Sequence, residues 1–352
     1  MKLIKTVEAE GAVLCHDITQ IVKGVTKDAI FRKGHIVTKE DIPVLLRVGK
    51  DQLYVWEKEE GMLHENEAAE ILCGLCQGEY MERSEVKEGK IELMATCDGL
   101  LKVQSEGMKI VNGFGQMMIA SRHGNFPVKK GEKLAGTRII PLVIEEEKMR
   151  AVKEAAFAAS AGRPLLELKP FSHKKVGIIT TGNEVYYGRI QDTFTPVIEE
   201  KLKAFDTEII SHVIWHDDDR KVTKSIREMI KQGADVVICT GGMSVDPDDK
   251  TPLAIRNTGA RIVSYGAPVL PGAMFLLAYY EQDRKQKARS VAVMGLPGCV
   301  MYAKRTIFDL ILPRIMADDE VTGEELAALG EGGLCLSCPE CTFPNCGFGK
   351  GK

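Results

Sequence analysis

Two short apolar runs, each ending at a Thr-Gly pair, limit what this chain can fold into more than any other feature. The first run covers residues 176–181 and is followed by Gly182. The second covers residues 235–240 and is followed by Gly241. Short β-branched runs closed by glycine are typical of buried parallel strands. Because parallel strands end at one edge of a sheet, and ligands bind at that edge, the sequence predicts a binding site where the two glycine turns meet.

The pattern around these runs alternates between strand and helix from residue 174 to residue 316. Helices are predicted at about 195–204 and after His216-Asp217-Asp218-Asp219, running to about Gln232, with an aspartate as the cap of the second. Other strands are predicted at 208–215, 261–263, 273–280 and 290–294, and an amphipathic helix is predicted to end near Met316. The alternation predicts a three-layer α/β domain with a mostly parallel sheet.

The length of the chain predicts further domains outside residues 174–316, because 352 residues exceed one ordinary domain. Two β-rich α+β modules are expected before the α/β domain, and a Cys-rich tail is expected after it. The predicted division is 1–60, 61–145, a helix and proline-containing linker at 146–173, the α/β domain at 174–316, and the tail at 317–352. Glycines in the tail, including Gly330, Gly332 and Gly333, predict that it moves independently of the domain.

Composition excludes several classes of function. A formal net charge of −3 leaves no electrostatic footprint for nucleic acid. No apolar run reaches the roughly 18 residues of a membrane span, and the N-terminus lacks the apolar stretch of a signal peptide. Without an export signal, the ten cysteines are expected to be reduced thiols or metal ligands, not disulfides. The cytoplasm is therefore the expected location.

The segment after the second strand carries the candidate chemistry. Gly241 and Gly242 allow backbone N–H groups to approach an anion closely. Asp246, Asp248 and Asp249 follow within a few residues and supply the hard oxygen ligands that Mg²⁺ takes beside a phosphate. The segment therefore predicts a phosphate and Mg²⁺ site. An acidic surface turn that caps the next helix is the alternative.

A series of motifs, taken in order, resembles the molybdopterin-binding domain of molybdenum-cofactor biosynthesis proteins. The nearer likeness is to the molybdopterin molybdenumtransferase branch. The motifs are Thr181-Gly182-Asn183-Glu184-Val185, Gly188-Arg189-Ile190-Gln191-Asp192-Thr193, Asp217-Asp218-Asp219, Thr240-Gly241-Gly242-Met243-Ser244, Pro271-Gly272 and Leu296-Pro297-Gly298. The resemblance covers residues 174–316, while residues 1–60 and 136–144 only loosely resemble that family's N-terminal β modules.

The resemblance implies molybdopterin as ligand, molybdate as co-substrate, Mg²⁺ as cofactor and a set of site residues. The implied pterin-binding residues lie on four loops: Thr181, Gly182, Glu184, Gly241, Gly242, Ser244, Pro271, Gly272, Pro297 and Gly298. The implied catalytic residues are three carboxylates: Asp192, Asp218 and Asp249. The implied Mg²⁺ ligands are Asp249 together with Asp246 and Asp248.

Departures from the family pattern keep more than one function open. Asn183 stands where the family usually has aspartate, Phe194 where asparagine is usual, Ala273 where a lysine follows Pro-Gly, and Cys299 where an asparagine follows Leu-Pro-Gly; Asp246-Pro247 replaces a glycine-containing step. An enzyme that promotes molybdate insertion into molybdopterin or its adenylylated form is one hypothesis. A non-catalytic carrier or sensor that serves a molybdoenzyme is the second.

A third hypothesis is a nucleotide pyrophosphatase on the same fold. It rests on Pro247-Asp248-Asp249, which resembles the Pro-x-Asp-Asp loop of the competence-damage family. The sequence does not decide which pterin species binds, or whether the chain forms a homodimer.

The tail carries a second candidate site. Cys335, Cys338, Cys341 and Cys346 follow a Cys-x2-Cys-x2-Cys-x4-Cys pattern, which is one residue longer than ferredoxin spacing before the last cysteine. The spacing predicts a metal site, either a 4Fe-4S cluster or a tetrahedral zinc, and contact with a redox partner. An unliganded flexible tail is the alternative.

Overall fold

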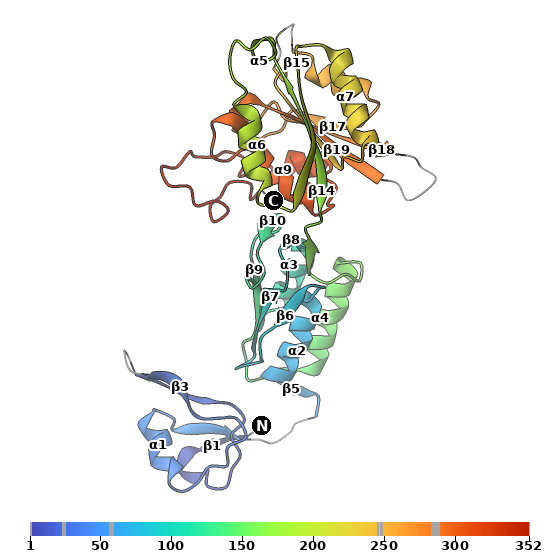
Figure 1. The fold of residues 1–352 in the computed structure, drawn as a ribbon. Helices are drawn as coiled ribbons and strands as arrows, with labels where there is room; N and C mark the ends of the chain where they lie inside the picture. Colours follow the sequence, from blue (N-terminus) through green and yellow to red (C-terminus); the bar gives the residue numbers. More distant parts are fainter. Residues whose placement is uncertain are drawn as a thin grey trace. The chain divides into compact units, whose positions relative to one another are not determined.

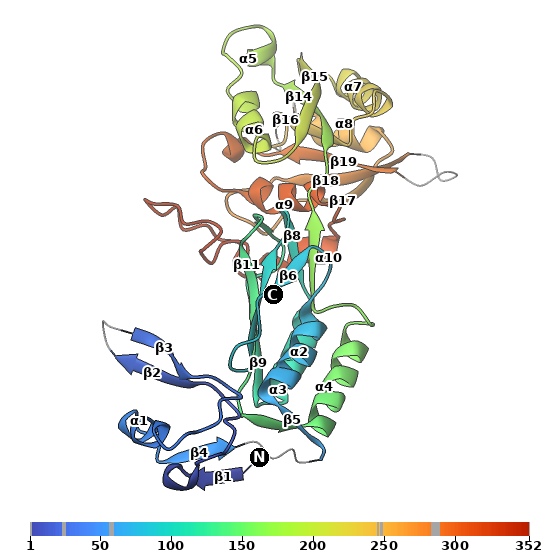
Figure 2. The same cartoon turned by 60° about the horizontal axis from the view of Figure 1, so that its bottom comes forward.

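The computed structural model describes residues 2–22, 26–55, 60–244, 246, 249–282 and 289–351. Asp248, a predicted Mg²⁺ ligand, lies outside the described residues. The chain divides into two compact units (Figures 1 and 2). Unit 1 contains Met1–Thr96, Val103–Arg122 and Gly131–Glu167, and unit 2 contains Cys97–Lys102, His123–Lys130 and Leu168–Lys352. Two short segments from the first half of the sequence therefore belong to unit 2.

The first part of unit 1 is built from short strands around a small core. Its elements are β1 (Lys2–Lys5), η1 (Thr6–Glu8), β2 (Ile18–Val22), β3 (Thr26–Phe31), α1 (Asp41–Arg47) and β4 (Gln52–Val55). β1 pairs with β4 and β2 with β3, both antiparallel. Leu14, Leu45 and Leu53 are buried between them, as short strands need a shared apolar face to be stable.

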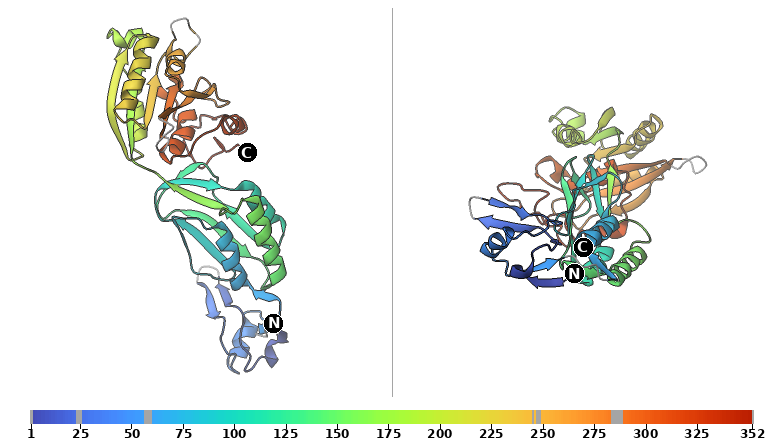
Figure 3. Two further views of the ribbon diagram at one scale, coloured as in Figure 1. Left: turned by 90° about the vertical axis from the view of Figure 1, so that its right-hand side faces the viewer. Right: turned by 90° about the horizontal axis from the view of Figure 1, so that it is seen from below.

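The rest of unit 1 is an antiparallel sheet packed with helices. Its elements are β5 (Met62–His64), α2 (Glu65–Cys76), β6 (Met81–Arg83), β7 (Lys90–Ala95), α3 (Ser105–Gly113), β9 (Met117–Ser121), β11 (Lys133–Ile139), β12 (Val143–Glu145) and α4 (Glu146–Ala159). The sheet order is β6-β7-β11-β9, and the left view of Figure 3 shows α2 and α4 running along it. This region is β-rich, as the sequence predicts, and it also contains the helix α3, which was not expected.

Unit 2 is organised around a six-stranded sheet of order β15-β14-β16-β19-β18-β17. Its strands are β14 (Lys174–Thr181), β15 (Thr207–Trp215), β16 (Val236–Thr240), β17 (Arg261–Tyr265), β18 (Leu276–Gln282) and β19 (Arg289–Leu296). Its helices are α5 (Asn183–Tyr186), α6 (Phe194–Leu202), α7 (Asp219–Lys231), α8 (Thr251–Asn257), η2 (Gly298–Met301), α9 (Ile307–Met316) and α10 (Gly323–Ala328). Four neighbouring strands are parallel, and β17 and β18 are antiparallel additions at one edge. The predicted α/β fold with a mostly parallel sheet is confirmed.

The two faces of the sheet follow from alternation along its central strands. Val236 and Ile238 of β16 pack with α6 and α9, whereas Val237 and Cys239 pack with α7 and α8. Successive side chains of a strand point to opposite faces, so a continuous apolar run is what a strand covered on both sides requires. Figure 1 shows α6 and α7 on opposite sides of β14.

A smaller three-stranded sheet completes unit 2. It consists of β10 (Phe126–Val128), β8 (Gly99–Val103) and β13 (Leu166–Pro170), in that order. β13 lies in the segment that the sequence predicts as a linker because of its two prolines. Phe126 of β10 is buried in the same core as β14 and α9, so this sheet is part of the packing of unit 2.

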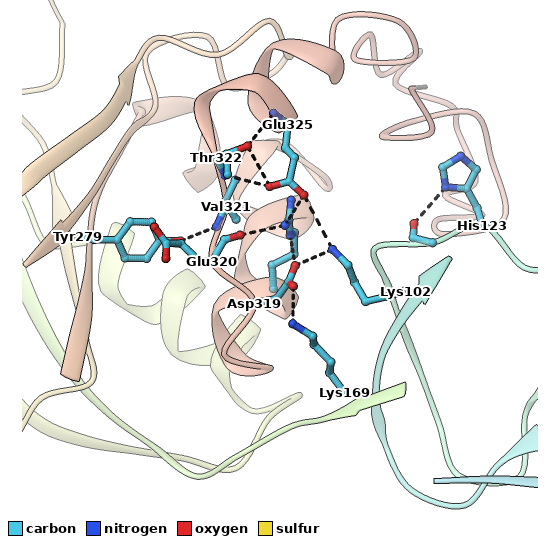
Figure 4. A network of polar contacts seen from close by, with 11 residues as sticks. Lys102, His123, Lys169, Tyr279, Asp319, Glu320, Val321, Thr322 and Glu325 are labelled. Atoms are coloured by element: carbon cyan, nitrogen blue, oxygen red, sulfur yellow. Dashed lines mark hydrogen bonds and ion pairs between the residues drawn. The ribbon is translucent and has the colours of Figure 1, made fainter. Parts of the chain in front are cut away.

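A network of ion pairs joins the small sheet to the segment after α9 (Figure 4). Asp319 is 6% exposed, and its carboxylate accepts hydrogen bonds from Arg314 Nε at 2.6 Å and from the Nζ atoms of Lys102 and Lys169, each at 2.8 Å. Arg314 also donates to Glu325 Oε1 at 2.7 Å. A buried carboxylate needs partners of this kind, because an unpaired charge there is costly.

The tail packs against unit 2, so the predicted independent movement is wrong. Val321, Leu326 and Phe348 are buried in the core that contains β14 and β16. Gly333 lies so close to the backbone of residues 268 and 329 that a Cβ atom there would lie 2.3 Å from one carbonyl oxygen and 2.5 Å from the other. Glycine therefore serves close packing here. No helix in the described part of the chain is both long and apolar enough to cross a lipid bilayer.

Candidate functional site

The carboxyl ends of three neighbouring strands form one edge of the unit 2 sheet. Thr180 of β14 is in register with Thr240 of β16, which is in register with Leu296 of β19. The loops that follow these strands start at Gly182, Gly241 and Pro297, and they leave from the same edge. The glycine turns at Gly182 and Gly241 therefore follow strand ends at the same edge of the sheet, as the sequence predicts.

A cavity of about 670 Å³ lies at this edge. It is lined by residues from the loops after β16 and β19 and from the segment before β18: Gly241, Gly242, Met243, Ser244, Asp246, Asp249, Leu270, Pro271, Gly272, Ala273, Met274, Leu296, Pro297, Gly298, Cys299, Met301 and Tyr302. We call this the Gly241 cavity. It brings together the predicted residues of the Gly241, Pro271 and Pro297 motifs.

The Gly241-Gly242 turn is held between the end of β14 and the start of α8. Both glycines have positive φ, +78° and +55°. A Cβ atom on Gly241 would lie 2.0 Å from the Thr181 carbonyl oxygen, and one on Gly242 would lie 2.9 Å from the Thr251 hydroxyl. Thr251 Oγ1 donates to the Gly241 carbonyl at 2.9 Å. Any side chain would therefore strain the turn, and its backbone stays open toward the cavity.

The charged side chains that line the Gly241 cavity are acidic. Asp246 and Asp249 contribute carboxylates, and no lysine or arginine belongs to the lining among the residues that the structure describes. The two aspartates are linked through the backbone, because Asp249 N–H donates to the Asp246 carbonyl at 2.9 Å. An anionic ligand here would be bound by backbone N–H groups and hydroxyls, with a cation between it and the carboxylates.

Other polar groups border this turn. Tyr265 Oη donates to the Met243 carbonyl at 3.0 Å, and burial and then the Asp249 charge raise the pKa of Tyr265. Thr240 is fully buried, and its Oγ1 has no hydrogen-bond partner among the described residues. A ligand or water that reached the strand end would find this hydroxyl available.

Two of the predicted catalytic carboxylates lie outside the cavity lining. Asp192 accepts from Phe194 N–H at 2.9 Å and from the hydroxyls of Thr195 at 2.6 Å and Thr180 at 3.1 Å. Burial would raise the pKa of Asp192, but these hydrogen bonds outweigh it and hold the pKa below its usual range. Asp218 accepts from the N–H groups of Arg220 and Lys221 and so caps α7, as the sequence predicted.

The first loop also stays outside the lining. The Thr181 hydroxyl stabilises the residues around the glycine turn. It donates to the Thr240 carbonyl at 3.2 Å and lies 3.2 Å from the Thr251 hydroxyl. Gly182 has φ +143°, and Glu184 is exposed on α5. The cavity lining also contains four residues that the sequence did not indicate, which are Leu270, Met274, Met301 and Tyr302. Their signal was only their position within a few residues of the Pro-Gly motifs.

The tail cysteines line a second cavity of about 580 Å³ in unit 2. Within the described ranges, no three histidine, cysteine, aspartate or glutamate side chains converge closely enough to hold one metal ion. This applies both to the tail and to the described aspartates of the Gly241 cavity. A magnesium ion there would thus need ligand oxygens from its substrate, as is usual for this metal.

Comparison with known proteins finds likenesses in two parts of the chain. Residues 177–317 match the family model described as a probable molybdopterin binding domain. Residues 3–57 match a domain of unknown function, DUF8806. The chain is 23% identical to the tungsten cofactor synthesizing protein MoaB from Pyrococcus furiosus in its crystal structure, with a TM-score of 0.34, covering 42% of this chain and 99% of that one.

Two curated relatives match parts of the sequence. A CinA-like protein of Mycobacterium tuberculosis is 34% identical over 90 residues, which are 25% of this chain and 21% of the relative. A molybdopterin molybdenumtransferase of Synechococcus elongatus is 26% identical over 204 residues, which are 55% of this chain and 47% of the relative. The matched stretches thus span less than half of each relative. The family match and the sheet that it covers place residues 177–317 in the molybdopterin-binding domain family.

Proposed function

We propose that the Gly241 cavity binds molybdopterin or its adenylylated form, and that the chain promotes molybdate insertion in molybdenum cofactor biosynthesis. The observation that carries the proposal is the glycine turn at the shared edge of three parallel strands, opening into a cavity of about 670 Å³. In open α/β sheets this edge is where ligands bind. The family of residues 177–317 indicates the ligand class.

The pterin phosphate would be held mainly by the backbone of the Gly241 turn and by the Ser244 hydroxyl. Both line the cavity, and the described lining has no cationic side chain that could do so instead. Backbone N–H groups suit this task because their positions are set by the fold. Pro271, Gly272, Pro297 and Gly298 also line the cavity and would contact the pterin ring.

Asp249, with Asp246, would hold Mg²⁺ against the ligand phosphate. These two carboxylates are the charged groups of the described lining, and two carboxylates plus phosphate oxygens form a common magnesium environment. When bound, Mg²⁺ would neutralise phosphate charge and polarise a phosphoanhydride. Asp192 and Asp218 act from outside the lining in this proposal, by positioning the loops before α6 and α7.

A non-catalytic carrier that delivers the cofactor to a molybdoenzyme is the second candidate. Ala273 and Cys299 line the Gly241 cavity at the positions where the resemblance implies lysine and asparagine. Without that lysine the cavity has less charge with which to bind molybdate. Turnover of adenylylated molybdopterin with molybdate and Mg²⁺ supports the enzyme, whereas tight binding without turnover supports the carrier.

Ligand retention tests the site itself. Molybdopterin retained by the native protein would be identified by mass spectrometry and its affinity measured. Gly242→Val should abolish binding, because the turn can no longer adopt its conformation, and Ser244→Ala should weaken it about tenfold through loss of one hydrogen bond. Gly113→Ala, whose added methyl has open space in α3, is the control. Wild-type affinity in both site variants would place the ligand elsewhere.

Metal dependence tests the carboxylates. Asp249→Asn keeps the shape of the side chain and removes its charge. It should raise the Mg²⁺ concentration needed for half-maximal activity at least tenfold and change molybdopterin affinity much less. Asp235→Asn, which removes a carboxylate at the opposite end of β16, is the matched control. An unchanged Mg²⁺ response of Asp249→Asn would remove Asp249 from the metal site.

A further inference from the structure

We propose that the tail of this chain binds an iron–sulfur cluster. Cys335, Cys338, Cys341 and Cys346 all line one cavity of about 580 Å³, formed with Phe343 and other residues of unit 2. Four cysteines around one cavity, at a spacing close to that of ferredoxins, form the ligand set of a four-iron cluster. The cluster site is independent of the proposed pterin function.

The tail is anchored at both ends of the cysteine segment. Cys335 N–H donates to the Leu270 carbonyl at 2.8 Å, and Leu270 N–H donates to the Gly333 carbonyl at 2.8 Å. At the other end Phe348 is buried, and its ring centroid lies 6.1 Å from that of Phe343. The cysteines are therefore presented by a segment whose ends are set by the fold, which lowers the entropy lost when they bind a metal centre.

The cysteine spacing favours a cluster over one zinc ion. Cys335, Cys338 and Cys341 follow the Cys-x2-Cys-x2-Cys pattern of ferredoxins, and Cys346 adds a fourth thiolate to the lining of the same cavity. In a four-iron cluster each thiolate binds a different iron, whereas one zinc ion would need all four sulfurs at about 2.3 Å.

Cations next to the cysteines would balance the negative charge of a thiolate-bound cluster. Lys304 and Arg305 line the same cavity, and Lys304 Nζ donates to the Pro339 carbonyl at 2.9 Å. The Arg305 guanidinium lies over the Phe343 ring at 4.9 Å. Its Nε atom is buried and has no hydrogen-bond partner among the described residues. Donors of this kind stabilise and tune cluster sulfurs.

The cluster would lie beside the Gly241 cavity, because Pro271 and Tyr302 line both cavities. If the proposed function holds, this position puts a redox centre next to a bound pterin; that consequence rests on the proposed function. The cluster proposal itself does not require that a pterin binds.

The test uses the full chain, purified without oxygen and reconstituted with ferrous iron and sulfide. We expect about four iron and four sulfide per chain, a broad visible absorption band, and a paramagnetic signal after reduction. Cys338→Ser and Cys341→Ser alter exposed side chains and should lose the band and most of the iron, while their iron-free forms melt at the temperature of iron-free wild type. Cys97→Ser changes a cysteine outside the cavity and should keep both the absorption band and the iron.

Three results would overturn the cluster. These are stoichiometric zinc in colourless protein, protein that takes up neither metal, and iron content unchanged in both serine variants. Molybdopterin retention, measured on the same preparations, separates this proposal from the proposed function. Serine variants that lose iron but retain molybdopterin support the cluster site, whether or not the pterin chemistry is as proposed. A wild-type chain that binds iron but no molybdopterin contradicts only the pterin site.

Discussion

Aspartates that look alike in this sequence have different roles once their neighbours are known. Asp218 caps α7, Asp192 holds the first turn of α6, and Asp249 lines the Gly241 cavity. Asp319, which drew no attention in the sequence, is buried among one arginine and two lysines. The difference is made by hydrogen-bond partners and burial, which are tertiary properties.

The Asp319 network predicts a pH-dependent contribution to stability. Burial would raise the pKa of Asp319, but hydrogen bonds from Lys102 and Lys169 and the charge of Arg314 lower it from 3.8 to about 2. A depressed folded-state pKa stabilises the protein above the unfolded-state pKa. This contribution, about 2 kcal/mol, is complete above about pH 5 and is lost as pH falls from there toward 2.

Asp319→Asn should therefore lower the free energy of unfolding by about 2 kcal/mol or more at pH 7, because it leaves buried cations without their partner. The difference in unfolding free energy between Asp319→Asn and wild type should shrink as the pH falls from 4 to 2. Denaturant unfolding at several pH values measures this difference, with Glu324→Gln at an exposed position as the control. A difference that is constant with pH would mean that the charge of Asp319 does not stabilise the fold.

At the scale of elements, the tail segment is held by close backbone packing. Gly333 has no room for a side chain, whereas a Cβ atom on Gly347 meets nothing within 4 Å. These two glycines of one segment therefore provide a matched pair. Composition alone assigned Gly333 to a flexible connection.

Gly333→Ala should lower the unfolding free energy by about 1 to 3 kcal/mol, because the methyl group would push apart two backbone carbonyls. Gly347→Ala should stay within about 0.5 kcal/mol of wild type. Thermal and denaturant unfolding of both variants measures the effect. Equal stability of the two variants would show that the tail is not packed on unit 2 in solution.

At the scale of the whole molecule, unit 2 is assembled from separate stretches of the chain. Lys102 and Phe126 come from the first half of the sequence, yet both contribute to unit 2. A fragment that begins at residue 174 contains the complete six-stranded sheet. It lacks all three strands of the small sheet and both lysines that pair with Asp319.

We expect the fragment 174–352 to unfold at a lower denaturant concentration than unit 2 within the full chain. The exposed core around the missing Phe126 and the unpaired Asp319 both destabilise it. Hydrogen exchange of β16 amides reports the stability of unit 2 in either protein. The full chain with Lys102→Ala and Lys169→Ala separates the ionic part of the loss. Equal protection of β16 in fragment and full chain would contradict the expected role of the small sheet.

The sequence by itself determined the mostly parallel sheet of unit 2 and the edge at which its strands end in glycine turns. Continuous β-branched runs that end at glycine are local signals, because a strand buried on both faces must be apolar throughout. The same is true of the Asp218 cap and of the glycines at the Gly241 turn, where backbone conformation depends on few neighbours.

Only the tertiary structure decided which residues share a cavity and which glycines are packed. Met274 and Tyr302 enter the Gly241 cavity, and β13 joins two strands from elsewhere in the chain, through contacts between residues far apart in sequence. Such contacts leave no periodicity behind. The tail illustrates the limit, because its glycines indicated mobility by composition, whereas Phe348 in the core holds the segment in place through packing that composition does not encode.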